Sequence, residues 1–307
     1  MLTSFFGKSK PLNLIVVILF MTAFFVAANF HEGFEEISLT GFFEILGVLL
    51  VFVLSILVLN FIARKNDLTK RSAYKILFFA VFSCSFIALL KNQQAILANL
   101  FLLFALRRIV SLRSHKFMQR KIFDATFWIC IASLFYFWAI LFVVVVYAGI
   151  MAYAARLKNW LIPPVAFLCV AAITTSFHIV AYDAFYTLPQ WFQASNFDFS
   201  LYREPQILVP LSIILALLLW TLLYYASIIQ KASVTQRPLL HLILLSLFTN
   251  ITIAVFSPHK DGSELIFFFV PLSIIASNYF DSKRDKIFRE VLLAILILMP
   301  FAIPFIF

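Results

Sequence analysis

Long, uninterrupted runs of apolar side chains constrain this chain more than any other feature of its sequence. Apolar residues make up 64% of the 307 positions, and charged residues make up only 12%. A soluble domain cannot hide that much apolar surface, because its outer shell must contact water. A bilayer accepts such a surface, and each helix that crosses it needs about 20 apolar residues. The composition therefore predicts an integral membrane protein with short loops.

The apolar runs predict an all-α fold, a polytopic transmembrane helical bundle in which residues 1–307 form a single membrane domain. About ten membrane segments fit the length of the chain. The predicted spans cover residues 12–30, 42–63, 75–90, 95–106, 161–181, 207–229, 238–257, 265–280 and 291–307. Residues 125–155 form one further apolar stretch, which is treated separately below.

Lysine and arginine are segregated along the chain, and this pattern predicts its orientation. The N-terminal segment and five loops (64–75, 107–121, 156–158, 231–237 and 283–289) hold all but three of the 24 Lys and Arg residues. Basic loops of membrane proteins stay on the cytoplasmic side. We therefore expect a bacterial inner-membrane protein with a cytoplasmic N-terminus and a periplasmic C-terminus.

The stretch 125–155 is flanked by basic loops on both sides, so both of its ends should lie in the cytoplasm. A single long helix would place Arg156 and Lys158 outside and invert every later loop. We therefore predict that this stretch is a tight, short or re-entrant hairpin. Short segments are tolerated where protein or a water-filled cavity covers them. Broken segments often line substrate sites, which is one interpretation of the short segments of 75–106 and 125–155. The alternative is that the ends of these spans are poorly predicted from the sequence.

The first outer loop, 31–41, is the strongest candidate for a catalytic site. It contains His31 and three carboxylates, Glu32, Glu35 and Glu36, and Glu44 follows at the entrance to the next span. Carboxylates can act as general bases or bind a divalent cation through oxygen ligands. A solvated acidic loop that merely obeys the charge asymmetry is the alternative. No other cofactor is indicated.

The long outer loop 181–206 mixes aromatic and charged side chains, a pattern that suits binding of a sugar or a lipid headgroup. The candidate binding residues are Asp183, Trp191 and Arg203, with His178 just before the loop. The alternative for the loop is a helix that lies in the membrane interface as an anchor. His178 has its own alternative, a hydrogen-bonded packing residue.

The inner loop 107–121 carries six Lys and Arg residues, among them Arg107, Arg108 and Arg113. Each basic residue near the surface attracts anionic headgroups by about 1 kcal/mol. The loop therefore suits the phosphate of a lipid-linked substrate. A purely topological role and docking of a partner are the alternatives.

Several classes of protein are excluded by what the sequence lacks. It has no Walker A, HExxH or GxSxG motif and no paired acidic motif of the prenyltransferase type. Mid-span ionisable residues are almost missing, which argues against proton-coupled transport. The five histidines fall on opposite faces of the predicted topology, so a His-ligated iron centre is rejected. We predict no metal centre of this kind and no nucleic-acid partner.

Three strings of the N-terminal half carry a family resemblance: FFGKSKPLN, LFALRRIVSLRS and KIFDATFWICIASLFYFWAILF. Together they resemble an uncharacterised multi-pass inner-membrane protein family of Bacteroidota, over about residues 4–160. The resemblance implies the inner membrane of a Gram-negative cell, with outer loops in the periplasm. It implies no activity, because the family has none established.

Three functions fit these observations. The first is an enzyme or handler of a lipid-linked envelope precursor, by analogy with the layout of membrane glycosyltransferases, in which Glu32, Glu35 or Glu36 acts as base or cation ligand. The second is a non-catalytic subunit of a membrane assembly, with a protein partner in the inner membrane. The third is a transporter or flippase for a lipid or an apolar solute. In each case membrane lipids are expected partners.

Overall fold

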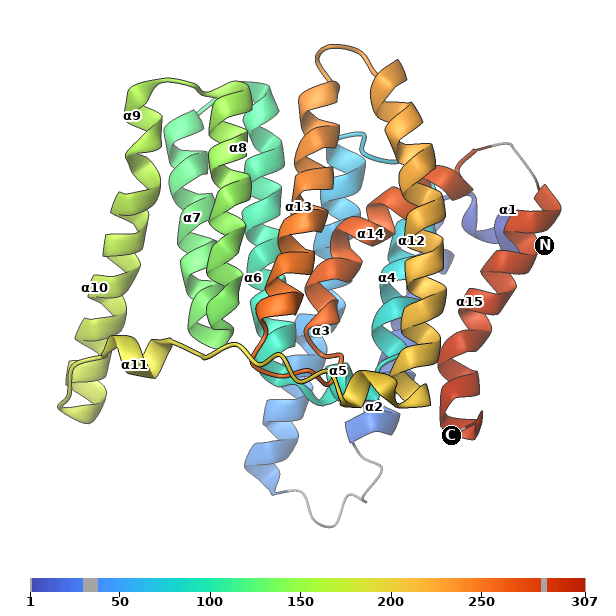
Figure 1. Cartoon of the computed structure of the whole chain (residues 1–307), viewed down its shortest axis with the longest axis horizontal. Helices are drawn as coiled ribbons and strands as arrows, with labels where there is room; N and C mark the ends of the chain where they lie inside the picture. Colours follow the sequence, from blue (N-terminus) through green and yellow to red (C-terminus); the bar gives the residue numbers. More distant parts are fainter. Residues whose placement is uncertain (1, 30–37, 283–285, 307) are drawn as a thin grey trace.

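A computed structural model describes residues 2–29, 38–282 and 286–306, and in these ranges the protein consists of helices without strands (Figure 1). The all-α helical bundle predicted from the apolar runs is therefore confirmed. Every backbone N–H and C=O in a bilayer needs a partner within the protein, and helices provide those partners inside each segment.

Six helices of the described ranges are long and apolar enough to cross a membrane. These are α2 (Pro11–Asn29), α3 (Leu39–Lys65), α6 (Gln93–Val110), α10 (Ile162–Tyr182), α12 (Pro205–Lys231) and α13 (Arg237–Phe256). The shorter or more charged segments beside them are α4 (Tyr74–Cys84), α7 (Met118–Phe135), η3 (Phe137–Phe142) with α8 (Val143–Tyr153), α14 (Leu265–Phe280) and α15 (Lys286–Ile306). Short helices at the ends of the bundle are α1 (Leu2–Phe6), α5 (Ile87–Lys91), η2 (Ser111–Ser114), α9 (Leu157–Trp160), α11 (Leu188–Trp191) and η4 (Leu201–Arg203).

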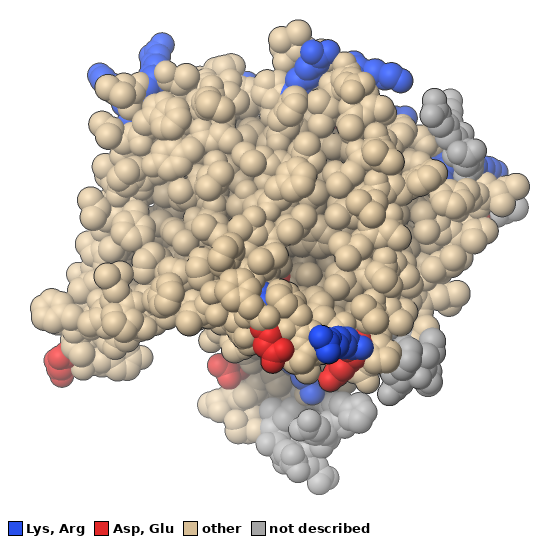
Figure 2. Space-filling view, viewed as in Figure 1, with Lys and Arg blue, Asp and Glu red and all other residues tan. Residues whose placement is uncertain are grey.

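The bundle has two chemically different ends. In Figure 2 most blue side chains lie along the upper edge, whereas the red ones lie along the lower edge together with a few blue ones. We call the edge formed by residues 64–75, 107–121, 156–158 and 231–237 the basic end. We call the edge formed by residues 183–204 and 257–264 the acidic end. Lysine and arginine thus cluster at one end of the helices, as the sequence predicts.

The stretch 125–155 turns back on itself, as predicted. α7 runs toward the acidic end, and η3 with α8 returns to the basic end beside it (Figure 1). The helix breaks at Tyr136, whose backbone is extended with φ −142° and ψ 97°. The two arms run alongside the neighbouring helices, so the hairpin crosses the bundle rather than entering it shallowly.

The segments predicted at 75–90 and 95–106 are divided differently in the structure. α4 already ends at Cys84, and the separate helix α5 follows it. α6 begins one residue after Asn92, whose side chain accepts a hydrogen bond from the Ala95 N–H at 3.0 Å, and continues to Val110. The apolar run 95–106 underestimates the length of α6, because Arg107 and Arg108 belong to the last turn of the helix. The aliphatic stems of these arginines cover apolar surface while their charged groups reach the basic end.

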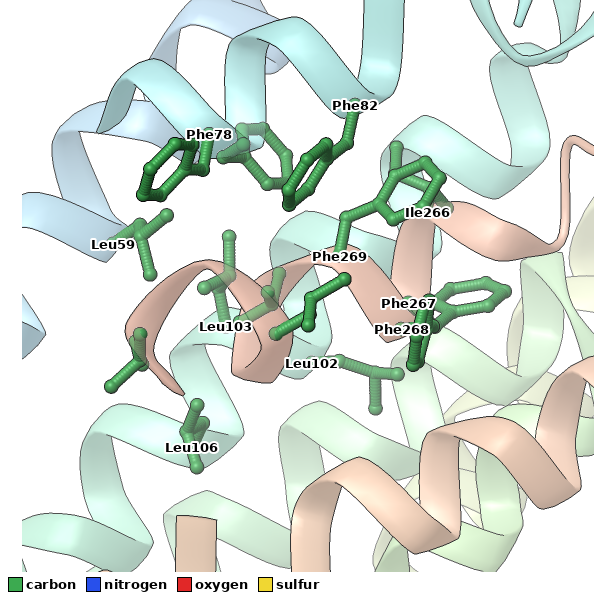
Figure 3. Packing of buried hydrophobic residues seen from close by; sticks show 14 of the residues in the cluster. Leu59, Phe78, Phe82, Leu102, Leu103, Leu106, Ile266, Phe267, Phe268 and Phe269 are labelled. Carbon is green, nitrogen blue, oxygen red and sulfur yellow. The ribbon is translucent and has the colours of Figure 1, made fainter. Parts of the chain in front are cut away.

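α4 and α14 form the centre of the bundle. All residues of α4 are buried, and so are those of α14 except Asn278. Phenylalanine rings fill the space between the two helices. The ring centre of Phe78 lies 4.7 Å from that of Phe280. The ring centre of Phe82 lies 5.7 Å from that of Phe269 (Figure 3). The prediction that the short segment α4 lines a substrate site finds no support here, and the cavities described below lie elsewhere.

The hairpin makes a prediction about topology. Lys116, Lys158 and Asp198 are exposed, and each can be replaced by a single cysteine in the full chain. These cysteines should react with a membrane-impermeant maleimide in membrane vesicles of known orientation. Because α7 and α8 form a hairpin, positions 116 and 158 should react from one face and position 198 from the other. Reaction of positions 116 and 158 from opposite faces would contradict the fold.

Candidate functional site

Of the four carboxylates predicted to be catalytic, the structure describes only Glu44. Glu32, Glu35 and Glu36, together with His31, lie outside the described residues. Glu44 lies in the first turns of α3, where it is exposed. Among the described residues, no group of three or more His, Cys, Asp or Glu side chains comes together as a metal site would require. A divalent cation at the first outer loop therefore stays a prediction.

The aromatic loop forms a strap along the acidic end. Residues 183–204 run from α10 to α12, mostly in extended conformation, with only the short helices α11 and η4 (Figure 1). An interfacial helix, one of the alternatives for this loop, is thus limited to the single turn of α11. The strap is attached to the bundle by polar contacts of Trp191, Gln193 and Asn196, which donate to or accept from neighbouring backbone groups and the Trp138 side chain.

The four binding residues predicted in this region do not converge. Trp191 packs against α7, and its Nε1 donates to the Ser133 carbonyl at 3.0 Å. His178 stays local, with Nδ1 3.0 Å from the Ala184 carbonyl oxygen. Asp183 is exposed and ends α10, whereas Arg203 is exposed in η4 near the start of α12. One site built from these residues is therefore not formed, because the strap is extended and separates them.

Arg107, Arg108 and Arg113, by contrast, do come together. They line a cavity of about 460 Å³ at the basic end, between the last turns of α3 and α6. We call it the basic cavity, and its lining consists of Phe61, Lys65, Asn66, Asp67, Arg107, Arg108, Ser111, Arg113, Ser114 and Lys121. The guanidinium of Arg107 lies 4.8 Å from the centre of the Phe61 ring, a cation–π contact that holds both at the mouth of the cavity.

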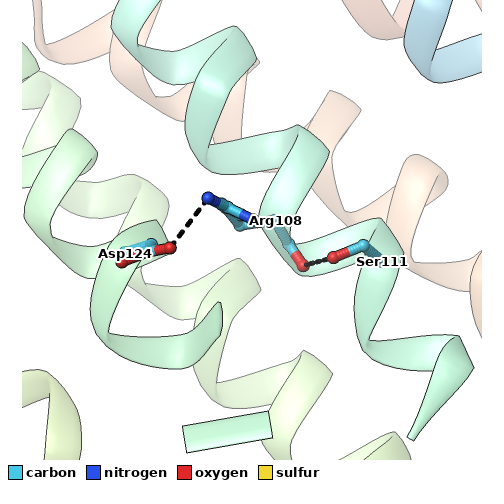
Figure 4. A network of polar contacts seen from close by, with 3 residues as sticks. All are labelled: Arg108, Ser111 and Asp124. Carbon is cyan, nitrogen blue, oxygen red and sulfur yellow. Dashed lines mark hydrogen bonds and ion pairs between the residues drawn. The ribbon is translucent and has the colours of Figure 1, made fainter. Parts of the chain in front are cut away.

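Four polar contacts shape one wall of the basic cavity. Arg108 forms an ion pair with Asp124 of α7 at 3.0 Å, and Ser111 donates to the Arg108 carbonyl at 2.8 Å (Figure 4). Lys121 donates to the Ser111 carbonyl and to the Ser114 hydroxyl, each at 2.6 Å. These contacts connect the start of α7 to the end of α6 and hold the side chains of Arg108 and Lys121 in position.

A second cavity of about 510 Å³ adjoins the first and shares Phe61, Lys65 and Asp67 with it. It adds Arg64, Lys70 and Arg71. Among the lining residues of the two cavities, eight are basic and one, Asp67, is acidic. Guanidinium groups match the oxygens of phosphate by paired hydrogen bonds, so this surface is suited to bind an oxyanion.

The acidic end holds a buried carboxylate that the sequence analysis missed. Glu264 is fully buried and accepts hydrogen bonds from the Tyr202 hydroxyl at 2.6 Å and from the Gly262 N–H at 3.0 Å. Burial raises the pKa of its carboxyl to about 7, and the hydrogen bond from Tyr202 opposes that shift. Nearby Asp261 raises this pKa further and Lys260 lowers it. The sequence contains a signal that could have identified this residue, because Glu264 directly precedes an apolar run, as Glu44 does.

Together, the apolar bundle and its charge-segregated ends define a multi-pass membrane protein. Residues 1–305, almost the whole chain, match the model of a family of unknown function (DUF6427), and the chain belongs to that family. It is also similar to the inner membrane protein YdgK of Escherichia coli (strain K12), with 28% identity over 136 residues that cover 43% of this chain and 91% of that protein. No solved structure matches. Membership of an uncharacterised family is thus confirmed, and the similarity to an inner membrane protein supports an inner-membrane location. An origin in Bacteroidota stays a prediction.

The buried carboxylate predicts how stability depends on pH. The pKa of Glu264 is raised from an ordinary 4.5 to about 7 in the folded protein, so its protonated form favours folding. This contribution is full below pH 4.5 and is lost as the pH rises through 7, with a magnitude of about 3 kcal/mol. Glu264→Gln should remove this loss, measured as the thermal midpoint in detergent between pH 5 and 8.

The exposed Glu44 supplies the control, and Glu44→Gln should keep the wild-type pH profile. If Glu264→Gln instead retains the full decline between pH 5 and 8, the buried carboxylate does not control stability in this range.

Proposed function

We propose that the protein handles a lipid-linked envelope precursor, whose phosphate binds in the basic cavity. The observation that carries this proposal is the convergence of five basic side chains, with one acid, around a cavity at the end of membrane helices. Each basic residue near the surface contributes about 1 kcal/mol to the attraction of an anionic headgroup. Arginine also provides the fixed geometry that a phosphate group requires.

The surface of α3 supports a lipid rather than a free phosphate as the ligand. Leu50, Leu54, Leu57 and Phe61 are all exposed, by 63%, 40%, 38% and 42%. Their spacing places them along one face of the helix. This face ends at Phe61, which lines both cavities at the basic end. A hydrocarbon tail can therefore lie along α3 while its phosphate contacts the arginines.

The charge pattern supports an inner-leaflet position for this site. With the basic end in the cytoplasm, the N-terminus is cytoplasmic, the C-terminus is periplasmic, and the strap faces the periplasm. The basic cavity and the carboxylates of the acidic end then lie on opposite sides of a hydrocarbon core about 30 Å thick. A headgroup held at the basic end is out of their reach, which favours binding or transport of the lipid over catalysis by those carboxylates.

The experiment compares retention of defined lipids by the purified protein, measured by native mass spectrometry. A long-chain isoprenyl phosphate should be retained and the isoprenyl alcohol of equal length should not. Arg107→Gln with Arg113→Gln should weaken retention by about 2 kcal/mol, about 30-fold. The matched control is Arg156→Gln with Lys158→Gln, which removes the same charge from exposed positions outside the cavity.

Equal loss in both double variants would show that only net charge matters and would overturn the proposed site. Retention of phosphatidylglycerol as strong as that of the isoprenyl phosphate would leave an anionic-lipid site but would refute the precursor as its ligand. A protein that copurifies in fixed stoichiometry would instead favour the second function, a subunit of a membrane assembly.

A further inference from the structure

A separate, apolar cavity lies on the flank of the bundle, between α7 and α10. Its volume is about 160 Å³, and its acidic-end side is closed by the strap residues from Tyr186 to Trp191. Residues that line it from the three elements include Cys130, Leu134, Phe167, Val170, Thr174 and Trp191. An engineered protein cavity of about 150 Å³ with an apolar lining holds a benzene molecule, so this one has room for a short length of hydrocarbon.

The lining selects an apolar occupant. It contains no Lys, Arg, Asp, Glu or His side chain. Ser133 donates its hydroxyl to the Cys130 carbonyl at 2.7 Å, and Trp191 donates its Nε1–H to the Ser133 carbonyl at 3.0 Å. These donors are therefore already used within the protein. A charged ligand would lose its hydration here without gaining an oppositely charged partner.

The rim of the cavity is open toward the outside of the bundle. Leu134, Phe167 and Leu188 are exposed by 37%, 37% and 73%. α10 is the least buried of the long helices, with 11% of its most apolar window covered by the rest of the protein. In a bilayer, lipid tails surround these side chains. The cavity is thus a lateral recess that a neighbouring tail can enter directly from the membrane.

We propose that this recess binds one hydrocarbon chain of a membrane lipid, in the leaflet at the acidic end, with α11 of the strap as its cover. Trp191 closes the recess on the side of the acidic end, with its ring centre 5.7 Å from that of Phe167 on α10 and 4.9 Å from that of Phe137. Aromatic side chains of this kind are enriched at the membrane–water boundary, where tails give way to headgroups. This site is independent of the basic cavity, which lies at the other end of the bundle.

Two neighbouring alanines on α10 provide a matched pair of variants. Ala171 lines the recess and Ala172 does not, although both are exposed on the same turn of the helix. Ala171→Trp places a bulky side chain in the recess, whereas Ala172→Trp adds the same group to the lipid-facing surface. The full chain is reconstituted in nanodiscs with a phosphatidylcholine that carries a diazirine in one acyl chain, irradiated and digested, and the adducts are located by mass spectrometry.

The wild-type protein should show adducts at Val170 and Thr174 in excess over those at Leu219, a lipid-facing residue of α12 that is 67% exposed. Ala171→Trp should lower the recess adducts to the level at Leu219, and Ala172→Trp should leave them unchanged. Recess adducts no more frequent than those at Leu219 in the wild-type protein would overturn the proposal, whether or not the variants fold. So would an equal loss in both folded variants.

Discussion

The whole structure depends on the absence of water in the bilayer core, which forces backbone groups to pair inside the protein and charges to stay at its ends. Helices meet the first demand in the segments that run between the two ends of the bundle. Where a helix breaks, the break is placed near an end or covered by protein. Tyr136, at the turn between α7 and η3, is buried, and its hydroxyl shares a hydrogen bond with Ser257.

The same constraint decides where chemistry can occur. Two clusters of polar groups lie at opposite ends of the bundle, an open cluster of basic side chains at one end and a closed network around Glu264 at the other. The open cluster is suited to bind a ligand, because its arginines are held in place and are accessible. The closed network joins the strap, through Tyr202, to the start of α14. The proposed ligand binding therefore belongs to the basic end, whereas the hydrogen bond of Glu264 attaches the strap.

The apolar part of the molecule is not uniform either. The centre, α4 and α14, is packed with phenylalanine rings, and the basic cavity and the recess lie outside it. α10 lies at the margin and encloses a recess with α7 and the strap. The family model matches residues 1–305, so the match extends over almost the whole bundle and is not confined to one part of it.

The sequence by itself determined the helical bundle, the two unequal ends and the hairpin at 125–155, because hydropathy and the positions of Lys and Arg act locally along the chain. It also placed Arg107, Arg108 and Arg113 in one loop. Only the tertiary structure decided that these arginines face Phe61 and Lys65 of α3, that Glu264 is buried under Tyr202, and that the strap separates Trp191 from Arg203. Those outcomes depend on which helices become neighbours, and side-chain packing between distant segments leaves no periodic signal in the sequence.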